Sequence, residues 1–343
     1  MSRPLNLKDL CAIYDLQTQG LDLDLERARL WPHSALTAAL TLRLPFSEIG
    51  ASTIVLYRNG DRSEALGLIQ TRVRHNRLEA DVTFIAPDIE TDHDAVTIWY
   101  RLLAEAANRL GEEGVQRLFA QLVEGNGKEE VFRQAGFTLY AHEDIYLLPA
   151  TELGARPEAG APRRLRRQRK RDAWYLLRLY ADTTPRHVQQ AEGMITSEGH
   201  VGKLGDWWDQ SLGTGYVLEE AGELCGATRI IRGRAANWLR LYVHPQARSC
   251  ADDVLADALG LLRTARPRPV YSSVRDYEGG VRGALEAAGF EHQARRCLMV
   301  KHMTVRVKEA VPWLAPAREP AGPVVRVSTH SFEGELEPEP QSA

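Results

Sequence analysis

The chain has 343 residues, of which 44% are hydrophobic and 26% are charged, and its formal net charge is -3. This composition is typical of soluble globular proteins, and the length is enough for two domains and a tail. The charge excludes a uniformly basic nucleic-acid binder, but it leaves room for a local basic patch.

The four cysteines are scattered along the chain and form no Cys-x-x-Cys pair. They therefore predict neither a disulfide framework nor a structural zinc site, and they favour a reducing compartment. The N-terminus lacks the apolar core of a signal peptide, and no segment approaches eighteen consecutive apolar residues. A cytoplasmic protein without a membrane span is expected. The cysteines are Cys11, Cys225, Cys250 and Cys297.

The first part of the chain predicts a short helix, a three-stranded antiparallel meander, a long helix, a further strand, a short helix and a final strand pair. Asn59-Gly60-Asp61 marks a hairpin, because Asn and Gly tolerate positive φ. The strand after the long helix should be parallel to the one before it, since a whole helix separates them. The expected elements are residues 7–19, 52–58, 64–73, 78–87, 94–110, 115–123, 128–134 and 138–148.

A similar order follows in the second part. An opening strand, a helix, a hairpin around Ala221-Gly222, a further strand, a long helix, another strand, a short helix and a final strand pair are expected. Their positions are residues 174–180, 184–194, 216–220, 225–231, 237–245, 251–264 and 269–274, followed by a short helix that ends at residue 288 and a strand region over 295–307. The predicted domains are 1–148 and 172–310, joined by a Pro/Gly-rich and then Arg-rich linker, 149–171, and followed by an acidic tail, 311–343, that we expect to be mostly disordered.

The two parts end in the same way. Residues 131–148 run through a helix, Gly136-Phe137 and a strand region, and residues 285–300 repeat this order around Gly289-Phe290. A glycine just past a helix accepts the left-handed conformation that ends it, and the phenylalanine can then fill the core. The repetition indicates that one αβ module was duplicated.

This order of elements, with its helix-Gly-Phe ending, resembles the fold of the GNAT acetyltransferases. The resemblance covers about residues 5–148 and 172–308. It implies an α/β protein with a mixed sheet, made of two tandem GNAT-like acyl-CoA N-acyltransferase folds.

GNAT enzymes hold the pyrophosphate of acetyl-CoA on a loop of the form V-x-P-x-x-R-x-x-G-x-G/A, between the fourth strand and the long helix. Backbone N–H groups and the helix dipole favour the phosphates there. The second module fits at Val243, Pro245 and Arg248, whereas Ala251 replaces the first glycine and Asp253 replaces the second small residue. The resemblance implies cofactor contacts from Val243, Arg248, Ser249, Cys250, Ala251 and Asp253.

The corresponding loop of the first module is acidic. Asp88, Glu90, Asp92 and Asp94 would surround a pyrophosphate with like charges, each pair costing roughly 4 kcal/mol at about 4 Å and an effective dielectric of about 20. The second module is therefore expected to be the working half. In the first, Asp92 or Asp94 is expected to cap the long helix.

The resemblance also implies a tyrosine four residues before the glycine, where it would protonate the departing thiolate. Phe132 and Leu285 stand there and cannot donate a proton. Tyr277 is the candidate substitute, with a packing role as the alternative. For a general base, the first module offers Glu79 and Asp81 on its last meander strand. The second offers only His244, which reads more simply as a loop residue.

Three further features of the second half bear on function. Trp207 and Trp208 precede the second hairpin, where the resemblance implies an acceptor pocket, so either could contact substrate. The basic run Arg163–Arg171 could contact nucleic acid or an acidic partner. The favoured interpretation is a solvated linker that lies against the acidic loop of the first module or the Glu-rich tail. Cys250 lies at a helix N-terminus, which would favour a thiolate, but no histidine partner points to catalysis.

Two functions remain open. The first is a GNAT-type N-acetyltransferase that uses acetyl-CoA as co-substrate, no metal, and an unknown small-molecule or peptide amine as acceptor. The second is a catalytically inactive GNAT-fold protein that binds a protein or a nucleic acid.

Overall fold

One mixed β-sheet runs through the part of the chain that the structure describes. The computed structural model describes residues 7–41, 51–58, 65–74, 78–125, 127–155, 164–193, 213–220, 222–244, 249–263 and 266–303. All of them belong to one structural unit, Met1–Arg306. The strands lie in the order β2-β3-β4-β5-β12-β6-β11-β10-β9-β8-β7, and β1 pairs with β4 away from this path.

The first half supplies strands β2 to β5 at one end of the sheet, the helices that cover them, and the long strand β6. Its elements are α1 (Leu7–Leu16), β1 (Leu21–Asp22), α2 (Leu25–Leu30), α3 (Ala35–Thr41), β2 (Ser52–Tyr57), β3 (Ala65–Val73), β4 (Glu79–Ala86), α4 (Ala95–Glu112), β5 (Arg117–Val123), α5 (Lys128–Gln134) and β6 (Thr138–Leu148). The second half repeats this order after a short connection. Its elements are α6 (Ala150–Ala155), β7 (Arg166–Arg167), η2 (Lys170–Asp172), α7 (Ala173–Thr183), α8 (Arg186–Ala191), β8 (Thr214–Glu220), β9 (Glu223–Arg232), β10 (Asn237–Val243), α10 (Ser249–Leu262), β11 (Val270–Arg275), α11 (Gly279–Ala287) and β12 (Glu291–His302).

The two helix-Gly-Phe junctions form as predicted. Gly136 has φ +88° and Gly289 has φ +74°, the left-handed region in which a side chain is strained. Phe137 and Phe290 follow them and are buried. Each junction therefore ends a helix and anchors the next strand in the core.

The structure corrects three expectations about local elements. Residues 174–180 lie in helix α7 and not in a strand, because Leu176, Leu179 and Tyr180 are buried at helical spacing. Each half ends in one long strand, β6 or β12, where a strand pair was expected. The start of the linker forms helix α6, which buries Leu153. The Asn59–Asp61 turn and the tail after residue 303 lie outside the described residues.

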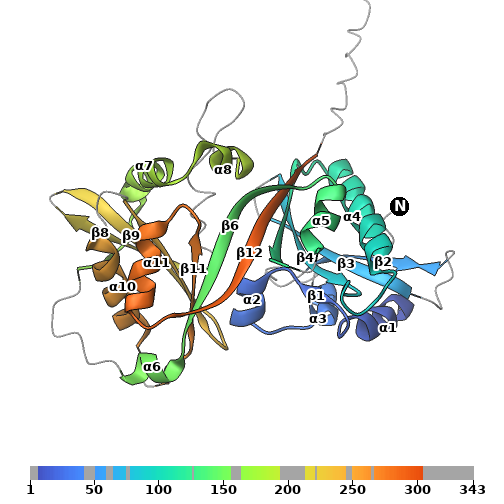
Figure 1. The fold of residues 1–343 in the computed structure, drawn as a ribbon, viewed down its shortest axis with the longest axis horizontal. Helices are drawn as coiled ribbons and strands as arrows, with labels where there is room; N and C mark the ends of the chain where they lie inside the picture. The colour runs from blue at the N-terminus through green and yellow to red at the C-terminus, as the bar shows by residue number, and fades with distance from the viewer. Residues whose placement is uncertain are drawn as a thin grey trace, which may run out of the picture. The chain divides into compact units, whose positions relative to one another are not determined.

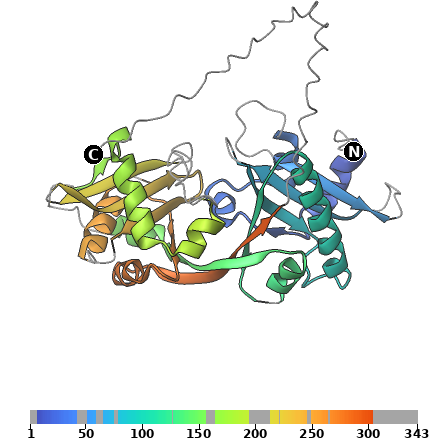
Figure 2. The ribbon, with the colours of Figure 1, turned by 90° about the horizontal axis from the view of Figure 1, so that it is seen from above.

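The two halves exchange their last strands. Strand β12 of the second half pairs antiparallel with β5 of the first half, from Arg296 opposite Val123 to His302 opposite Arg117. Strand β6 of the first half pairs antiparallel with β11, and β6 and β12 also pair with each other. Figure 1 shows these two strands running side by side in the middle of the sheet, and Figure 2 shows the red end of β12 among the strands of the first half.

Helices cover both faces of the sheet. Helices α4, α5, α10 and α11 pack on one face, and α1, α2, α3, α7 and α8 pack on the other. The exchanged strands complete the cores of the opposite halves. Cys297 and Met299 of β12 pack with α4 and α5, while Tyr146 and Leu148 of β6 pack with α10 and α11. Each hydrophobic core is thus built from both halves of the sequence.

The parallel strand pair of each half separates after a short contact. Strands β4 and β5 pair from Glu79 opposite Arg117 only as far as Asp81 opposite Phe119, although β4 continues to Ala86. Strands β10 and β11 likewise pair only from Asn237 to Leu239 on β10, although β10 continues to Val243. In each pair, the carboxyl ends of the two parallel strands therefore separate. The connection between the two strands of a pair is a long helix, α4 or α10, as predicted.

Candidate functional site

The gap between β10 and β11 in the second half has helix α10 at its open end. Strand β10 ends at the half-buried Val243, and α10 begins at Ser249. In open α/β sheets, ligands bind at the carboxyl ends of strands where the connection changes direction. A long helix that starts there presents free N–H groups and its positive dipole end. The backbone of this region is thus suited to an anionic group.

Three predicted contact residues lie in the first turns of α10. Cys250 and Ala251 are buried in the core beneath the helix and leave only their backbone for a ligand. Asp253 is half-exposed, and its carboxylate accepts a hydrogen bond from Nη1 of Arg164 at 2.6 Å. Arg164 also pairs with Glu220. The carboxylate that would repel a phosphate is therefore balanced by an arginine from the basic run.

The Cys250 side chain does not favour the thiolate that its place at a helix N-terminus predicted. Burial, together with the neighbouring Cys225 and Glu220, raises the pKa of the Cys250 thiol to about 12. The sulfur donates to Glu220 Oε2 at 3.7 Å. Near neutral pH the group is a protonated thiol and a poor nucleophile.

Tyr277 follows β11 directly and lies on the α8 side of the sheet, packed near Ala141, Val188 and Leu298. Arg275 Nη1 donates to its oxygen at 2.7 Å. Burial raises the pKa of Tyr277 to about 12, although Arg275 opposes that rise. The phenol therefore keeps its proton near neutral pH, and because Arg275 occupies an oxygen lone pair, the O–H remains able to donate.

A buried network of charges surrounds this tyrosine, and sequence reasoning did not identify it. Arg275 pairs with Glu192, which follows α8, and Glu192 accepts a hydrogen bond from Tyr180 of α7 at 2.7 Å. Arg240, on β10, reaches Glu278 at 3.3 Å. These residues are far apart in sequence and carry no shared motif. The sequence offered one signal for the network, a charged residue in each of two otherwise apolar strands: Arg240 in β10 and Arg275 in β11.

The two carboxylates of this network differ in the direction of their pKa shifts: the pKa of Glu192 is lowered, whereas that of Glu278 is raised. The oxygens of Glu278 accept from the backbone N–H of Arg275 at 2.9 Å and from Arg240 Nη2 at 3.3 Å. Burial raises the pKa of Glu278 above its usual 4.5, although Arg240 and Arg275 act in the opposite direction. A carboxylate with a raised pKa is better matched to proton transfer near neutral pH than an ordinary one.

The first half offers a different chemistry at the equivalent places. Lys128 pairs with Glu90 and lies 3.5 Å from Asp88, so a buried lysine balances part of the acidic loop. Asp94 precedes α4 without a side-chain cap, while Asp92 accepts from the Asp94 N–H at 2.7 Å. The acidic loop is thus held by the contacts of Lys128 from α5 and by a hydrogen bond within the loop.

The other acid–base candidates of the first half are also engaged. Arg74 reaches Glu79 at 3.1 Å and Asp81 at 2.5 Å, and Arg117 reaches Glu79 at 2.8 Å. Phe132 and Leu285, at the family's tyrosine positions, are fully buried core residues. Neither position can donate a proton.

Several predicted residues cannot be placed. Arg248, Trp207, Trp208 and Pro245 lie outside the described residues, as does Arg163 at the start of the basic run. Two arginines of the described part of that run, Arg164 and Arg166, form ion pairs within the second half. Arg166 bonds to Asp172 at 2.7 Å and to Glu219 at 2.8 Å. These contacts place Arg164 and Arg166 beside acidic residues of their own half, where the sequence suggested the first loop or the tail.

No protein-family model matches the sequence, and no curated protein matches it. Among solved structures, the chain is similar to a GCN5-related N-acetyltransferase from Sphaerobacter thermophilus, with 14% identity and a TM-score of 0.49, over 88% of this chain and 95% of that one. It is also similar to a tandem GNAT protein from the clavulanic acid biosynthesis pathway, with 15% identity and a TM-score of 0.49, over 86% and 94%. A GCN5-related N-acetyltransferase from Anabaena variabilis has 13% identity and a TM-score of 0.37, over 83% and 73%.

The strand order decides the fold. Each half has an antiparallel meander, a long helix and a parallel strand that parts from its neighbour, followed by a helix-Gly-Phe ending. The chain has a tandem GNAT fold. The fold class predicted from the sequence is confirmed, with the exchange of β6 and β12 as its unpredicted feature. Within the described ranges, no helix is long and apolar enough to cross a membrane.

Proposed function

We propose that the protein is a GNAT-type N-acetyltransferase that transfers an acetyl group from acetyl-CoA to an amine, and that the second half does the work. The observation that carries this proposal is the parting of β10 from β11 after Leu239, with the start of α10 at the open end. Backbone groups freed in such a gap can bind an extended amide-containing chain, and a helix N-terminus suits its phosphates.

The chemistry needs an acid and a base. The amine nitrogen forms a bond to the acetyl carbon, the carbon–sulfur bond breaks, and the departing thiolate takes a proton. Tyr277 supplies that proton, because it stays protonated and its O–H is not used by Arg275. Glu278, the neighbouring buried carboxylate, accepts the proton that the amine loses.

The acceptor would enter on the α7 and α8 side of the sheet, where the charged network lies. Trp207 and Trp208 stand before β8 in the sequence and remain candidates for contacting it. The structure holds several arginines and carboxylates on this side, including Arg240, Arg275 and Glu192. A polar amine is therefore a better match than an apolar one.

Calorimetric titration of the full chain with acetyl-CoA tests the proposal. Arg248→Ala should weaken binding by about tenfold or more, because a charge-assisted bond to phosphate contributes about 1.5–3 kcal/mol. The matched control is Glu90→Ala, the same loop position in the first half, which should leave the affinity unchanged. No heat at millimolar acetyl-CoA, or equal effects of the two variants, would overturn the assignment to the second half.

The alternative is a protein without activity that uses the fold as a binding module. It is favoured by the core residues Phe132 and Leu285 at the tyrosine positions and by the Asp253–Arg164 pair at the loop. Its nucleic-acid version predicts that Arg163–Arg171 supplies affinity that falls steeply with salt. Fluorescence anisotropy with labelled DNA and RNA at several salt concentrations tests this version. Acetyl transfer without nucleic-acid binding would support the enzyme, and salt-sensitive binding without acetyl transfer would support the binding module.

A further inference from the structure

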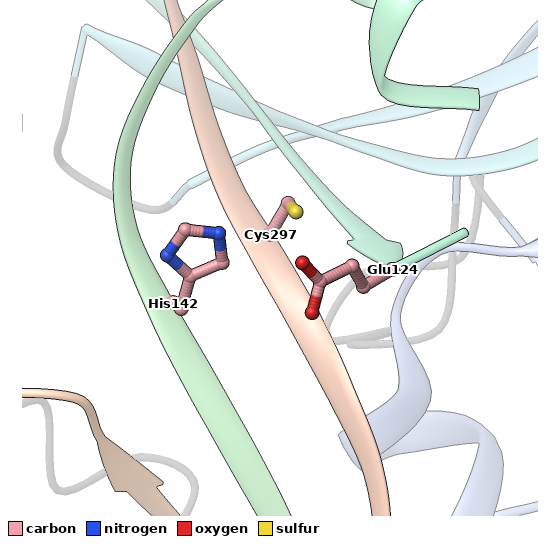
Figure 3. Close-up of side chains that lie close together, drawn as sticks. All are labelled: Glu124, His142 and Cys297. Atoms are coloured by element: carbon pink, nitrogen blue, oxygen red, sulfur yellow. The ribbon is translucent and has the colours of Figure 1, made fainter. Parts of the chain in front are cut away.

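Three potential metal ligands meet where the exchanged strand enters the first half. Glu124, His142 and Cys297 each offer one ligand atom, and these atoms all lie within 4.8 Å of one another. Figure 3 shows them converging, with a ring nitrogen of His142 on the side of Cys297 and Glu124. They come from the end of β5, from β6 and from β12.

The sheet register explains why the three side chains share one face. Cys297 lies opposite His142 across the β12–β6 pair and opposite Leu122 across the β12–β5 pair. Glu124 is two residues beyond Leu122, which puts it on the same side because side chains alternate along a strand. The Glu124 N–H donates to the Arg295 carbonyl at 2.8 Å, which fixes its backbone against β12.

The histidine is oriented as a metal ligand would be. Its Nδ1 lies 3.8 Å from Asp276 Oδ2, so the other ring nitrogen is left for the side facing Cys297. A carboxylate that accepts a hydrogen bond from the second ring nitrogen of a ligating histidine sets the ring orientation, and Asp276 lies just beyond hydrogen-bond distance of that nitrogen. This support comes from the turn after β11, so a fourth segment of the chain contributes to the cluster.

Two carboxylates, those of Glu124 and Glu129, lie close to the Cys297 sulfur. Glu129 of α5 accepts from the Cys297 sulfur at 3.7 Å and from the Gly125 N–H at 2.9 Å. Arg295 balances one oxygen of Glu124 at 3.4 Å.

We propose that Glu124, His142 and Cys297 form a zinc site, with the carboxylate of Glu129, which lies next to Cys297, as the fourth ligand. A thiolate, an imidazole and carboxylates suit a borderline-soft transition ion, whereas calcium and magnesium prefer oxygen ligands alone. The site clips β12, from the second half, to β5 and β6 of the first half. It is a structural site, and it stands independently of the proposed acetyl transfer.

A second cluster provides the matched control. Glu220, Cys225 and Cys250 also lie within 4.8 Å of one another, but Glu220 is paired with Arg164 and no histidine takes part. Both clusters contain a buried cysteine. Cys297→Ser and Cys250→Ser therefore compare the same small change at two buried sites.

Titration of the full, metal-stripped chain with Co²⁺ tests the proposal, because cobalt replaces zinc and bonding to a thiolate gives a charge-transfer absorption band. The wild-type chain and Cys250→Ser should show the band at one equivalent, Cys297→Ser should lack it, and His142→Gln should bind at least tenfold more weakly. No band in the wild type, a band that persists in Cys297→Ser, or a band lost in Cys250→Ser would each overturn it.

Thermal unfolding with and without Zn²⁺ adds a readout that does not need a coloured ion. Zinc that binds only the folded chain should raise the melting temperature of the wild type and of Cys250→Ser. It should leave that of Cys297→Ser unchanged. His142 is partly exposed, so His142→Gln keeps the test valid even if the cysteine variant folds poorly. An equal zinc shift in all four proteins would contradict the site.

Discussion

At the scale of single residues, the buried carboxylate of Glu143 governs the middle of the sheet. It lies on β6, pairs with Arg240, and accepts from Arg296 Nη2 at 2.5 Å and Nε at 3.0 Å. Burial alone would raise the pKa of Glu143, but Arg296 and Arg240 outweigh it and hold that pKa well below the usual 4.5. The Glu143 carboxylate is therefore ionised in the folded protein.

Glu143→Gln should destabilise the chain by about 3–5 kcal/mol, because it removes the carboxylate paired with the buried guanidinium of Arg296 and leaves Arg240 with Glu278 alone. The measurement is urea unfolding at several pH values. Since the folded pKa is depressed, the contribution of Glu143 is full above pH 4.5 and falls as the pH drops below it, so the variant and the wild type should converge in acid.

The matched control is Glu105→Gln, which removes a solvent-exposed carboxylate paired with Arg109 at 2.7 Å on the surface of α4. Exposed pairs of this kind contribute about 0.3–0.5 kcal/mol. A loss in Glu143→Gln no larger than in this control would show that the buried network does not hold the strands together.

Tyr277→Phe should lower kcat by about a hundredfold or more while leaving the KM for acetyl-CoA nearly unchanged, because it removes a proton donor and keeps the ring. Steady-state kinetics with any accepted amine checks this. Tyr175→Phe, at an exposed tyrosine of α7, is the control and should retain full activity. Equal activity of the two variants would assign Tyr277 to packing, the alternative that the sequence left open.

At the scale of elements, the helix-Gly-Phe junction shows how a short pattern fixes a local structure. The positive φ of Gly289 ends α11, and Phe290 then enters the core beside Leu285. The same pattern works at Gly136 in the first half. Periodicity was a weaker guide in residues 174–180, where a short apolar run fits a strand and a helix equally well and tertiary packing chose the helix.

Gly289→Ala should cost roughly 1–2 kcal/mol of unfolding free energy, since a non-glycine residue is strained at φ +74°. Gly283→Ala is a sharp control, because Gly283 lies inside α11 and an added methyl group meets nothing within 4 Å at either position. That variant should instead stabilise the chain by roughly 0.5–1 kcal/mol. Thermal unfolding that gave the two changes the same sign would contradict the backbone argument.

At the scale of the whole molecule, the exchange of β6 and β12 makes the two halves depend on each other. Strand β5 has β12 as its antiparallel neighbour, and β11 has β6. The buried pair of Glu143 with Arg296 also joins the two exchanged strands. A zinc ion bound at Cys297 would connect the two halves in the same region, where β6 and β12 pair.

Residues 1–155 expressed alone should not form a stable monomer, because the chain then lacks β12 and leaves the edge of β5 unpaired. Two copies can instead exchange β6 strands, so a dimer or an aggregate is expected. Analytical ultracentrifugation decides between these states. Addition of residues 156–310 should restore a one-to-one complex, whereas a folded, monomeric first half would show that the exchange is dispensable.

The sequence by itself determined the order of most elements, the two Gly-Phe junctions and the tandem GNAT fold, because helix ends, hairpins and periodicity are local properties of the chain. Only the tertiary structure decided which half each final strand completes. It also brought Glu278 and Arg275 around Tyr277, and Glu124 and His142 to Cys297. Strand register and long-range charge pairing depend on residues more than a hundred positions apart, and no local pattern records them.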